Sequence, residues 1–421
     1  MVGSGFPDSP WRDRQILLGI GGGIAAYKLA EVASTLAKNG AQVRAILTEQ
    51  AERFITPLTL GTLCRHPTYG DADFWHPAPL SPTETQPQHP LHIALGAWAE
   101  VILLAPLTAN TLAKLTYGLA DNLLTNTILA STCPVVLAPA MNTDMWLQQT
   151  VQRNWQEICQ NDRYHGIAPD SGLLACDRVG IGRMADPQVL LSYGESLLYT
   201  QGKRDLQGQH ILVTAGATRE YLDPVRFLSN PATGRMGIAL AEAAIHRGAA
   251  GVTLIQSGLL ETTCFSPGIQ SVAVKTAAEM QQALETHFPQ HEILLMAAAV
   301  GDVQPQSYSG EKLPKVNIPN PLPLRPVPDL LATLSALKQP HQRMIGFAAQ
   351  TGDIATPAWD KLQRKGLDGI VANPVDQPYS GFGSAYNQGI LIDAQGQQCH
   401  ILPCTKLALA HRIYDWVLQL P

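Results

Sequence analysis

The chain has 421 residues, of which 45% are hydrophobic and 15% are charged, with a formal net charge of −5. This length suits two or three globular domains, and the weakly acidic balance excludes a basic nucleic-acid-binding surface. No apolar run reaches the roughly 18 residues that a membrane span needs. Residues 1–14 lack the apolar segment of a signal peptide, so we expect a disordered leader there. The seven scattered cysteines contain no CxxC pair, which predicts a reducing, cytoplasmic environment without a disulfide framework or zinc site.

The first three predicted elements have the pattern of a phosphate-binding βαβ unit. Apolar residues 16–20 predict a strand, Gly21–Gly23 a tight turn, residues 24–38 a helix and residues 43–47 a second strand. The turn satisfies the loose GxGxxG/A spacing, which alone is a weak signal. Because the second strand closes with Thr48 and not with an acid, the pattern favours a mononucleotide over a dinucleotide. A turn that serves only packing is the alternative.

Polar residues follow the next predicted strand. Residues 67–90 are rich in proline and polar residues and predict a loop. A strand at residues 101–105 is expected to stop at Pro106, and Thr108, Asn110 and Thr111 begin the following helix. Such side chains hold phosphate oxygens or cap free N–H groups. His92 precedes this strand, and a lone histidine is more often structural than catalytic.

Two further residues of the first half stand out. Asn142 follows a predicted strand at residues 134–138 and offers both a donor and an acceptor to a carboxylate or amide. Cys176 lies between glycine-rich flanks and near two arginines. A cationic neighbourhood favours a thiolate that exchanges protons near neutral pH, whereas a buried, inert cysteine is the alternative.

The second half opens at a polar linker, residues 203–209. Residues 211–214 predict a buried strand, and a helix begins near Gly237 after a long charged loop that contains Asn230. Most such loops have only about 2–6 residues. Because open α/β sheets bind ligands at the carboxyl ends of their strands, this loop predicts a second binding site.

Later strands also end in candidate binding residues. The strand at residues 292–296 runs into the small residues Ala297, Ala298 and Ala299, which let a flat ligand approach the backbone, and then into Asp302. Asp302 either reaches a Mg²⁺ carried by a nucleotide or caps a turn. Residues 303–328 predict a flap with Lys312 and Lys315. The other candidates are Pro328, Asp329, Leu330 and Leu331 at a helix start, Phe347 at a strand end, and Lys361 and Lys365 on one helix face.

The chain resembles the bifunctional enzymes of coenzyme A biosynthesis that join a phosphopantothenoylcysteine decarboxylase to a CTP-dependent phosphopantothenate–cysteine ligase. The resemblance covers residues 15–415. Its motifs are long and specific: GIGGGIAAYK, HIALGAWAE, PLTANTLAKL, GLADNLL, PAMNTDMW, GLLAC, GIGRM, VTAGATRE, DPVRFLSN, GRMG, MAAAV, GFAAQT and KLQRKGLDGIVAN.

The resemblance implies an α/β fold with two Rossmann-like domains. The first, residues 15–202, is expected to be flavodoxin-like and to act as an FMN-dependent decarboxylase. In that family the substrate thiol is oxidised to a thioaldehyde, CO₂ leaves, and the ene-thiolate is reduced again. Cys176 falls on the proton donor, His92 on the residue of early proton transfer and Asn142 on the residue that holds the carboxylate. The residues assigned to FMN are Gly22, Gly23, Ile24, Thr48, Thr108 and Asn110.

The second domain, residues 203–421, is expected to contain a parallel sheet and to be the ligase. The carboxylate of 4′-phosphopantothenate attacks CTP, and cysteine then displaces CMP from the acyl-cytidylate. Asn230 is expected to hold this intermediate. The residues assigned to CTP are Ala297, Ala298, Ala299, Asp302, Lys312, Pro328, Asp329, Leu330, Leu331, Phe347, Lys361 and Lys365, with Asp302 also assigned to nucleotide-bound Mg²⁺.

Some positions depart from the family pattern. Asp177 replaces a glycine and Pro314 interrupts a lysine cluster, which weakens the assignment of Lys315. Arg235 replaces a lysine and Gln350 an acid, so neither is assigned to the site. The family also suggests decarboxylase trimers and ligase dimers, which together would build a dodecamer. Alternative functions are an enzyme with one degenerate half, a flavin-binding regulatory subunit, for which the usual acidic tail is missing, and an NAD-linked reductase.

Overall fold

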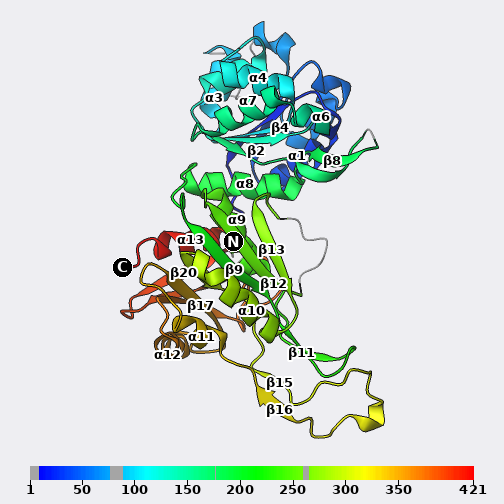
Figure 1. Cartoon of the computed structure of the whole chain (residues 1–421). Coiled ribbons are helices and arrows are strands. Elements are labelled where there is room, and N and C mark those ends of the chain that lie inside the picture. Colours follow the sequence, from blue (N-terminus) through cyan, green and yellow to red (C-terminus); the bar gives the residue numbers. More distant parts are fainter. Residues whose placement is uncertain (1–8, 76–88, 176, 259–264) are drawn as a thin grey trace. The chain divides into compact units, whose positions relative to one another are not determined.

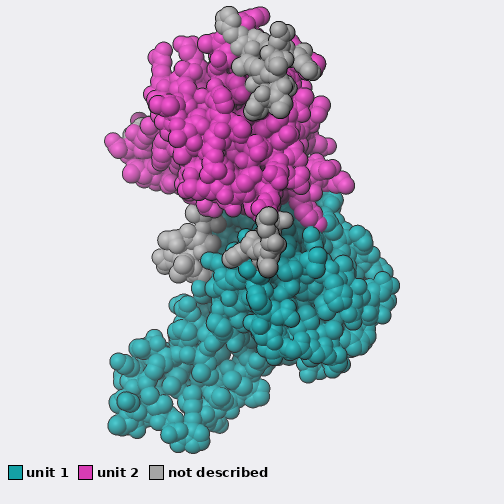
Figure 2. Space-filling model, turned by 180° about the vertical axis from the view of Figure 1, so that it is seen from behind, with its two compact units in different colours: residues 1–7, 204–421 teal, residues 8–203 magenta. Residues whose placement is uncertain are grey.

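The structure is a computed structural model that describes residues 9–75, 89–175, 177–258 and 265–421 (Figure 1). The chain divides into two compact units between Lys203 and Arg204, shown in different colours in Figure 2. We call them the N-terminal unit and the C-terminal unit. Within the described ranges, no helix combines the length and the apolarity that a bilayer crossing requires.

The N-terminal unit is built on a six-stranded sheet with the order β3-β2-β1-β4-β5-β6, and all of its strand pairs are parallel. This is the strand order of the doubly wound nucleotide-binding fold. Since β3 has only two residues, the five longer strands also follow the flavodoxin order. The predicted Rossmann-like, flavodoxin-like α/β fold is therefore confirmed for this unit.

Successive residues of the central strand β1 point to opposite faces of this sheet, and both faces are buried. On β1, Ile16, Leu18 and Ile20 belong to one core cluster, whereas Leu17 belongs to the cluster on the other face. The strands are β1 (Gln15–Ile20), β2 (Gln42–Leu47), β3 (Thr68–Tyr69), β4 (Val101–Leu107), β5 (Val135–Pro139) and β6 (Tyr164–Gly166), with a separate hairpin of β7 (Asp170–Leu173) and β8 (Val179–Arg183).

Helices cover both faces of the sheet. Residues of α1, α2 and α8 join the first cluster, and residues of α3, α4, α5 and α7 join the second. The helices are α1 (Leu29–Lys38), α2 (Pro57–Cys64), α3 (Leu91–Trp98), α4 (Ala109–Tyr117), α5 (Leu123–Ala130), α6 (Thr143–Trp146), α7 (Gln149–Cys159) and α8 (Pro187–Thr200), with short 3₁₀ turns η1 (Ile24–Lys28), η2 (Ala51–Arg53) and η3 (Asp71–Trp75).

The C-terminal unit repeats this plan with two added strands. Its eight-stranded sheet has the order β13-β12-β9-β14-β17-β18-β19-β20, of which the last two strands pair antiparallel. The six parallel strands again follow the doubly wound order. The main strands are β9 (His210–Gly216), β12 (Gly251–Ser257), β13 (Ile269–Val274), β14 (Ile293–Met296), β17 (Arg343–Gln350), β18 (Gly369–Pro374), β19 (Tyr386–Asp393) and β20 (Gln398–Thr405).

The same alternation builds two cores in this unit. Ile211, Val213 and Ala215 of β9 pack with α9 and α13, whereas Leu212 packs with α10, α11 and α12. The helices are α9 (Arg235–His246), α10 (Ala277–His287), α11 (Leu330–Ser335), α12 (Ala355–Lys365) and α13 (Lys406–Val417), with 3₁₀ turns η4 (Phe288–Gln290) and η5 (Lys315–Asn317).

A buried arginine ties α9 to the start and the end of this unit. Arg247 is 2% exposed. Its guanidinium donates to Asp205 at 2.7 Å, to Asp415 on α13 at 2.7 Å and to the His411 carbonyl at 3.0 Å. Because charge-assisted hydrogen bonds replace the lost water, this buried cation is compensated.

The structure departs from the sequence-based expectations in several segments. Residues 9–14, expected to be disordered, form a turn in which Trp11 is buried in the core; residues 1–8 lie outside the described part. β4 does not stop at Pro106 but continues to Leu107. A strand predicted at residues 369–372 is expected to break at Asn373 and Pro374, but β18 includes both. Both prolines lie at strand ends, where a missing N–H costs little.

The two long loops of the C-terminal unit contain short hairpins. The loop after β9 includes β10 (Arg219–Tyr221) and β11 (Phe227–Ser229), which pair antiparallel. The predicted flap at residues 303–328 begins and ends in β15 (Val303–Pro305) and β16 (Leu324–Pro326), and it extends as an arm from the body of its own unit (Figure 1).

Candidate functional sites

Each sheet has one point at which its strand order reverses. It lies between β1 and β4 in the N-terminal unit and between β9 and β14 in the C-terminal unit. The loops that leave neighbouring strands in opposite directions open a crevice there, and open α/β sheets bind their ligands at that point. The predicted site residues follow these strands.

The glycine turn after β1 is packed on one side and open on the other. The Gly21 N–H donates to the Pro106 carbonyl at 3.2 Å. A Cβ on Gly21 would lie 2.5 Å from that oxygen, and one on Gly22 would lie 2.3 Å from Gln50 Cβ. A Cβ on Gly23 would contact only Pro106 Cγ, at 3.7 Å. Close packing therefore explains the first two glycines, and the open side begins at Gly23 and Ile24, whose side chain is 57% exposed.

The polar residues assigned to the cofactor have different environments. Thr108 caps α4, since its hydroxyl accepts from the Thr111 N–H at 3.2 Å. The Thr48 hydroxyl accepts from the Ala51 N–H at 3.3 Å. Asn110 is exposed on the first turn of α4. Local capping hydrogen bonds thus account for both threonine hydroxyls, while Asn110 is an exposed residue.

His92 lies in the first turn of α3. Because α3 returns the chain to the amino end of β4, this turn is on the carboxyl edge of the sheet. The ring packs against Phe74 with 5.2 Å between ring centroids. Its Nδ1 is buried without a hydrogen-bond partner among the described residues. Since a buried polar atom without a partner is costly and rare, this nitrogen is poised to bond a ligand.

Asn142 is held at the end of β5 by the β7–β8 hairpin. Its side chain caps α6 by accepting from the Asp144 N–H at 2.8 Å. The preceding residue, Met141, donates its N–H to the Gly182 carbonyl of β8 at 3.0 Å. A Cβ on Gly182, whose φ is +147°, would lie 2.2 Å from the Met141 carbonyl oxygen. The hairpin is therefore seated directly against the Asn142 loop.

Cys176 lies outside the described residues. The residues before and after it in the β7–β8 connection are described. The Leu174 N–H donates to the Arg178 carbonyl at 2.8 Å. Arg178 pairs with Asp144 of α6 at 3.0 Å. Leu174 and Arg178 are thus held together, and Arg178 is tied to Asp144, two residues after Asn142.

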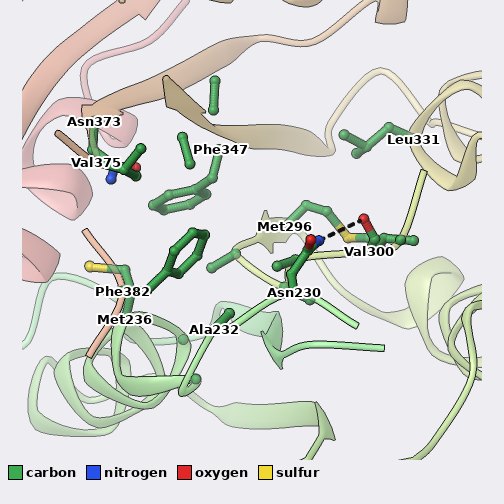
Figure 3. Close-up of a pocket in the computed structure, with 18 of the residues that line it drawn as sticks. Asn230, Ala232, Met236, Met296, Val300, Leu331, Phe347, Asn373, Val375 and Phe382 are labelled. Carbon is green, nitrogen blue, oxygen red and sulfur yellow. Dashed lines mark hydrogen bonds between the residues drawn. The ribbon is translucent and has the colours of Figure 1, made fainter. Parts of the chain in front are cut away.

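A cavity of about 640 Å³ lies at the reversal point of the C-terminal unit (Figure 3). It collects residues from β14, β17, α9, α11 and α12, which are far apart in the sequence. The assigned residues that line it are Asn230, Ala297, Ala298, Ala299, Asp302, Pro328, Asp329, Leu330, Leu331, Phe347, Lys361 and Lys365.

Hydrogen bonds fix the backbone that forms one wall of this cavity. Ala298 N–H donates to the Thr214 hydroxyl and Ala299 N–H to the Gly216 carbonyl, at 3.0 and 2.8 Å. The Asn230 amide reaches the Val300 carbonyl at 3.5 Å (Figure 3). A Cβ on Gly237 would lie 2.6 Å from the Thr214 carbonyl oxygen, so glycine there lets α9 approach β9.

The two predicted lysines of α12 are half-buried and line the cavity. Lys361 donates to the Phe347 carbonyl at 2.7 Å, and burial, with the nearby Lys365, lowers the pKa of Lys361 to about 8. Lys365 pairs with Asp329 at 3.1 Å. Although burial opposes it, the hydrogen bond from the Ala332 N–H and the pair with Lys365 hold the pKa of Asp329 below its usual range.

Asp302 lines the cavity with an exposed side chain, and its carbonyl accepts from the Val327 N–H at 3.0 Å. Among the residues described, no group of three or more His, Cys, Asp or Glu side chains is arranged to hold a metal ion. A cation at Asp302 would therefore have to bring most of its ligands with it.

Lys312 is the one assigned nucleotide residue that does not line the cavity. It is exposed on the arm between β15 and β16. The adjacent Leu313 is tied to the β10–β11 loop, because its N–H donates to Asp223 at 3.2 Å and its carbonyl accepts from Arg226 at 2.7 Å. The arrangement of this chain does not bring Lys312 to the other assigned residues.

Several residues that line the cavity were not assigned from the sequence. Arg235 and Gln350 were left out because they depart from the family pattern, yet both line it. Lys406 and Phe382 also line it, from α13 and from the loop before β19. The Phe382 and Phe347 rings point toward one another (Figure 3). Lys406 starts a helix after two antiparallel strands, a position without a local sequence signal.

Known proteins match both units. Residues 7–197 match the family model described as Flavoprotein, and residues 206–420 match the one described as DNA/pantothenate metabolism flavoprotein C-terminal domain. The chain is 38% identical over 408 residues to the coenzyme A biosynthesis bifunctional protein CoaBC of Bacillus subtilis (strain 168), with 97% of each chain covered. The same protein of Vibrio cholerae is 39% identical over 403 residues, covering 95% of this chain and 96% of that one. A crystal structure of the C-terminal domain of CoaBC matches 51% of this chain and 96% of its own, with 31% identity and a TM-score of 0.43.

Proposed function

Because the chain belongs to the family of coenzyme A biosynthesis bifunctional proteins, we propose that its C-terminal unit joins 4′-phosphopantothenate to cysteine and its N-terminal unit decarboxylates the product. The chain is thus an enzyme with a ligase and a flavoprotein decarboxylase activity. The observation that carries the assignment of the ligase site is the cavity, since twelve of the thirteen residues assigned to this half line it.

In the ligase, a carboxylate must be activated before an amine can displace its oxygen. The 4′-phosphopantothenate carboxylate attacks the α-phosphate of CTP, which forms an acyl-cytidylate and releases pyrophosphate. The amine of cysteine then attacks the acyl carbon, the amide forms, and CMP leaves with the former carboxylate oxygen. These two steps replace a poor leaving group, the carboxylate oxygen as oxide or hydroxide, with a good one, CMP.

The cavity residues support these steps in distinct ways. The fixed backbone at Ala297–Ala299 and the Phe347 ring are suited to a flat nucleobase. Lys361 and Lys365 place positive charge near the phosphates, where charge develops as pyrophosphate leaves. Asn230, in the long loop between β9 and α9, has an uncharged amide that can both donate and accept hydrogen bonds, and it is assigned to the acyl-cytidylate. Mg²⁺, if it enters bound to CTP, would reach Asp302.

In the decarboxylase, the chain's own residues position the substrate and move protons. His92 offers for the early proton transfer a ring nitrogen that has no partner among the described residues, and Asn142 is assigned to the departing carboxylate. Cys176 is assigned to proton donation after CO₂ has left, on a hairpin seated beside Asn142. When bound, FMN supplies the two-electron oxidation and re-reduction of the substrate that none of these side chains can perform.

The N-terminal unit fits a flavin mononucleotide in three respects. The turn at Gly23 is open where a phosphate or ring would approach. The exposed apolar side chain of Ile24 adjoins it. Asn110 is exposed on the first turn of α4. Two further proposals are a cytoplasmic location, supported by five cysteines that form no disulfide among the described residues, and the assembly of the two units into trimers and dimers.

Two assays separate the activities. The purified protein should release CO₂ from 4′-phosphopantothenoylcysteine without CTP. With 4′-phosphopantothenate, cysteine, CTP and Mg²⁺ it should form CMP and pyrophosphate. Lys361→Gln should abolish most of the second reaction and leave the first unchanged. A protein that releases no pyrophosphate under these conditions would contradict the proposed ligase.

A further inference from the structure

The backbone that follows β14 lines the cavity and is anchored to β9 and to the loop after it. Residues 296–302 all line the cavity, so one side of this segment faces open space. Backbone N–H and C=O groups that are withdrawn from water need partners, and this segment finds them on the side of β9. Ala298 and Ala299 hold its first part through their bonds to β9. The part that leads to Asp302 has a separate anchor.

That anchor is Thr218, the second residue after the end of β9. Thr218 is completely buried, with 0% of its surface exposed. Its N–H donates to the Ala299 carbonyl at 3.3 Å, and its hydroxyl accepts from the Gly301 N–H at 3.0 Å. The neighbouring Ala217 forms a parallel bridge with Ala299. Thr218 therefore holds the backbone on both sides of Val300.

Thr218 also holds the strand that leads to Asn230. Its carbonyl accepts from the hydroxyl of Ser229, the last residue of β11, at 2.8 Å. The Asn230 amide reaches the Val300 carbonyl at 3.5 Å, which is long for a hydrogen bond and contributes little by itself (Figure 3). The shorter bonds to Thr218 therefore set the position of Asn230 relative to Val300.

We propose that Thr218 is a positioning residue of the ligase, which sets the Asn230 amide against the cavity wall and so keeps the acyl-cytidylate bound until cysteine reacts. The inference rests on the proposed ligase function. Thr218 acts from behind the wall, because it is buried and is not among the residues that line the cavity. An acyl-cytidylate that is held loosely leaves the site or reacts with water, which returns 4′-phosphopantothenate and CMP after pyrophosphate has already been released.

The inference is tested by measuring pyrophosphate and the amide product of the full chain with 4′-phosphopantothenate, cysteine, CTP and Mg²⁺. Thr218→Val keeps the shape but leaves the Gly301 N–H without its acceptor, so amide formation should fall about tenfold. Pyrophosphate should then exceed the amide at least about twofold, whereas the wild type forms both in equal amounts. Thr218→Ser keeps the hydroxyl and should restore equal amounts. The control is Thr253→Val, since Thr253 is also buried and bonds His291 at 3.0 Å outside the cavity; its two products should stay equal.

A different pattern would overturn the inference. If Thr218→Val forms pyrophosphate and amide in equal amounts, at whatever rate, Thr218 serves the fold and does not position the site. If Thr218→Val does not fold, Ser229→Ala removes the bond to the Thr218 carbonyl at an exposed residue. That variant should also release excess pyrophosphate, and equal amounts would refute the inference. Wild-type protein that releases no pyrophosphate would instead refute the proposed ligase, and this inference with it.

Discussion

The hairpin that carries Cys176 offers the sharpest test of the decarboxylase half. Gly182 has a φ of +147°, and a Cβ there would lie 2.2 Å from the Met141 carbonyl oxygen. We expect Gly182→Ala to push β8 away from the Asn142 loop by about 1 Å, since unstrained Cβ contacts begin above 3.0 Å. The strained backbone costs on the order of 1–3 kcal/mol. Loss of the hydrogen bond from Met141 N–H adds about 1 kcal/mol.

The kinetic effect should exceed the effect on stability. A displacement of about 1 Å in a catalytic group can lower the rate about 100-fold. Because Cys176 is assigned to the last proton transfer, CO₂ release should continue while 4′-phosphopantetheine formation falls by about that factor. Rapid quenching with mass spectrometry would then detect the ene-thiol form of the product.

Gly118→Ala is the matched control. Gly118 also has a positive φ, +69°, but a Cβ there would meet no atom within 4 Å. This variant should lose about 1 kcal/mol of stability and keep the wild-type ratio of CO₂ to product. A folded Gly182→Ala protein that forms 4′-phosphopantetheine at the wild-type rate would refute the view that the hairpin positions the proton donor.

Four further outcomes are expected. Cys176→Ser should release CO₂ and accumulate the ene-thiol; normal product formation would remove Cys176 from the proton-donor role. Lys312→Gln should impair CTP-driven coupling and spare decarboxylation, although Lys312 lies outside the cavity of its own chain. A variant with full coupling activity would show that Lys312 does not bind the nucleotide. Arg247→Met should lower the free energy of unfolding of the C-terminal unit by about 3 kcal/mol, since it breaks a buried ion network. Arg325 is exposed, so the control variant Arg325→Met should change this free energy by less than about 0.5 kcal/mol. Equal denaturation curves for the two variants would contradict the prediction. Burial, with the nearby Lys365, lowers the pKa of Lys361 to about 8, so Lys361 loses its proton as the pH rises through that region. CTP affinity measured by calorimetry without cysteine should therefore be constant well below that pH and fall above it, and an affinity that does not fall as Lys361 loses its charge would contradict its role in phosphate binding.

The parallel α/β plan could be predicted because the signal was local. Buried strands at Gln15–Ile20 and His210–Gly216 alternate their apolar residues between two cores, and helices with one apolar face follow them. Parallel strands end at one edge of a sheet, so residues after β9, β14 and β17 converge there. This geometry is why most residues assigned to the nucleotide line one cavity.

The missed features depend on contacts between distant segments. Lys406 reaches the cavity only because β19 and β20 pair antiparallel and return the chain. Gly182 looks like an ordinary loop glycine until the Met141 carbonyl is placed beside it. Arg235 and Gln350 were left out because they differ from the family pattern, yet position, and not residue type, decides what lines the site. Pro106 and Pro374 fall within strands because their missing N–H groups lie at strand ends.

One measurement tests the central claim, that a single chain holds both activities. Purified protein alone is incubated with 4′-phosphopantothenate, cysteine, CTP and Mg²⁺, and 4′-phosphopantetheine is measured together with CMP, pyrophosphate and CO₂. We expect 4′-phosphopantetheine, and each of the three by-products, to form in equal amounts. Protein that carries FMN and binds CTP but yields no 4′-phosphopantetheine would contradict the account.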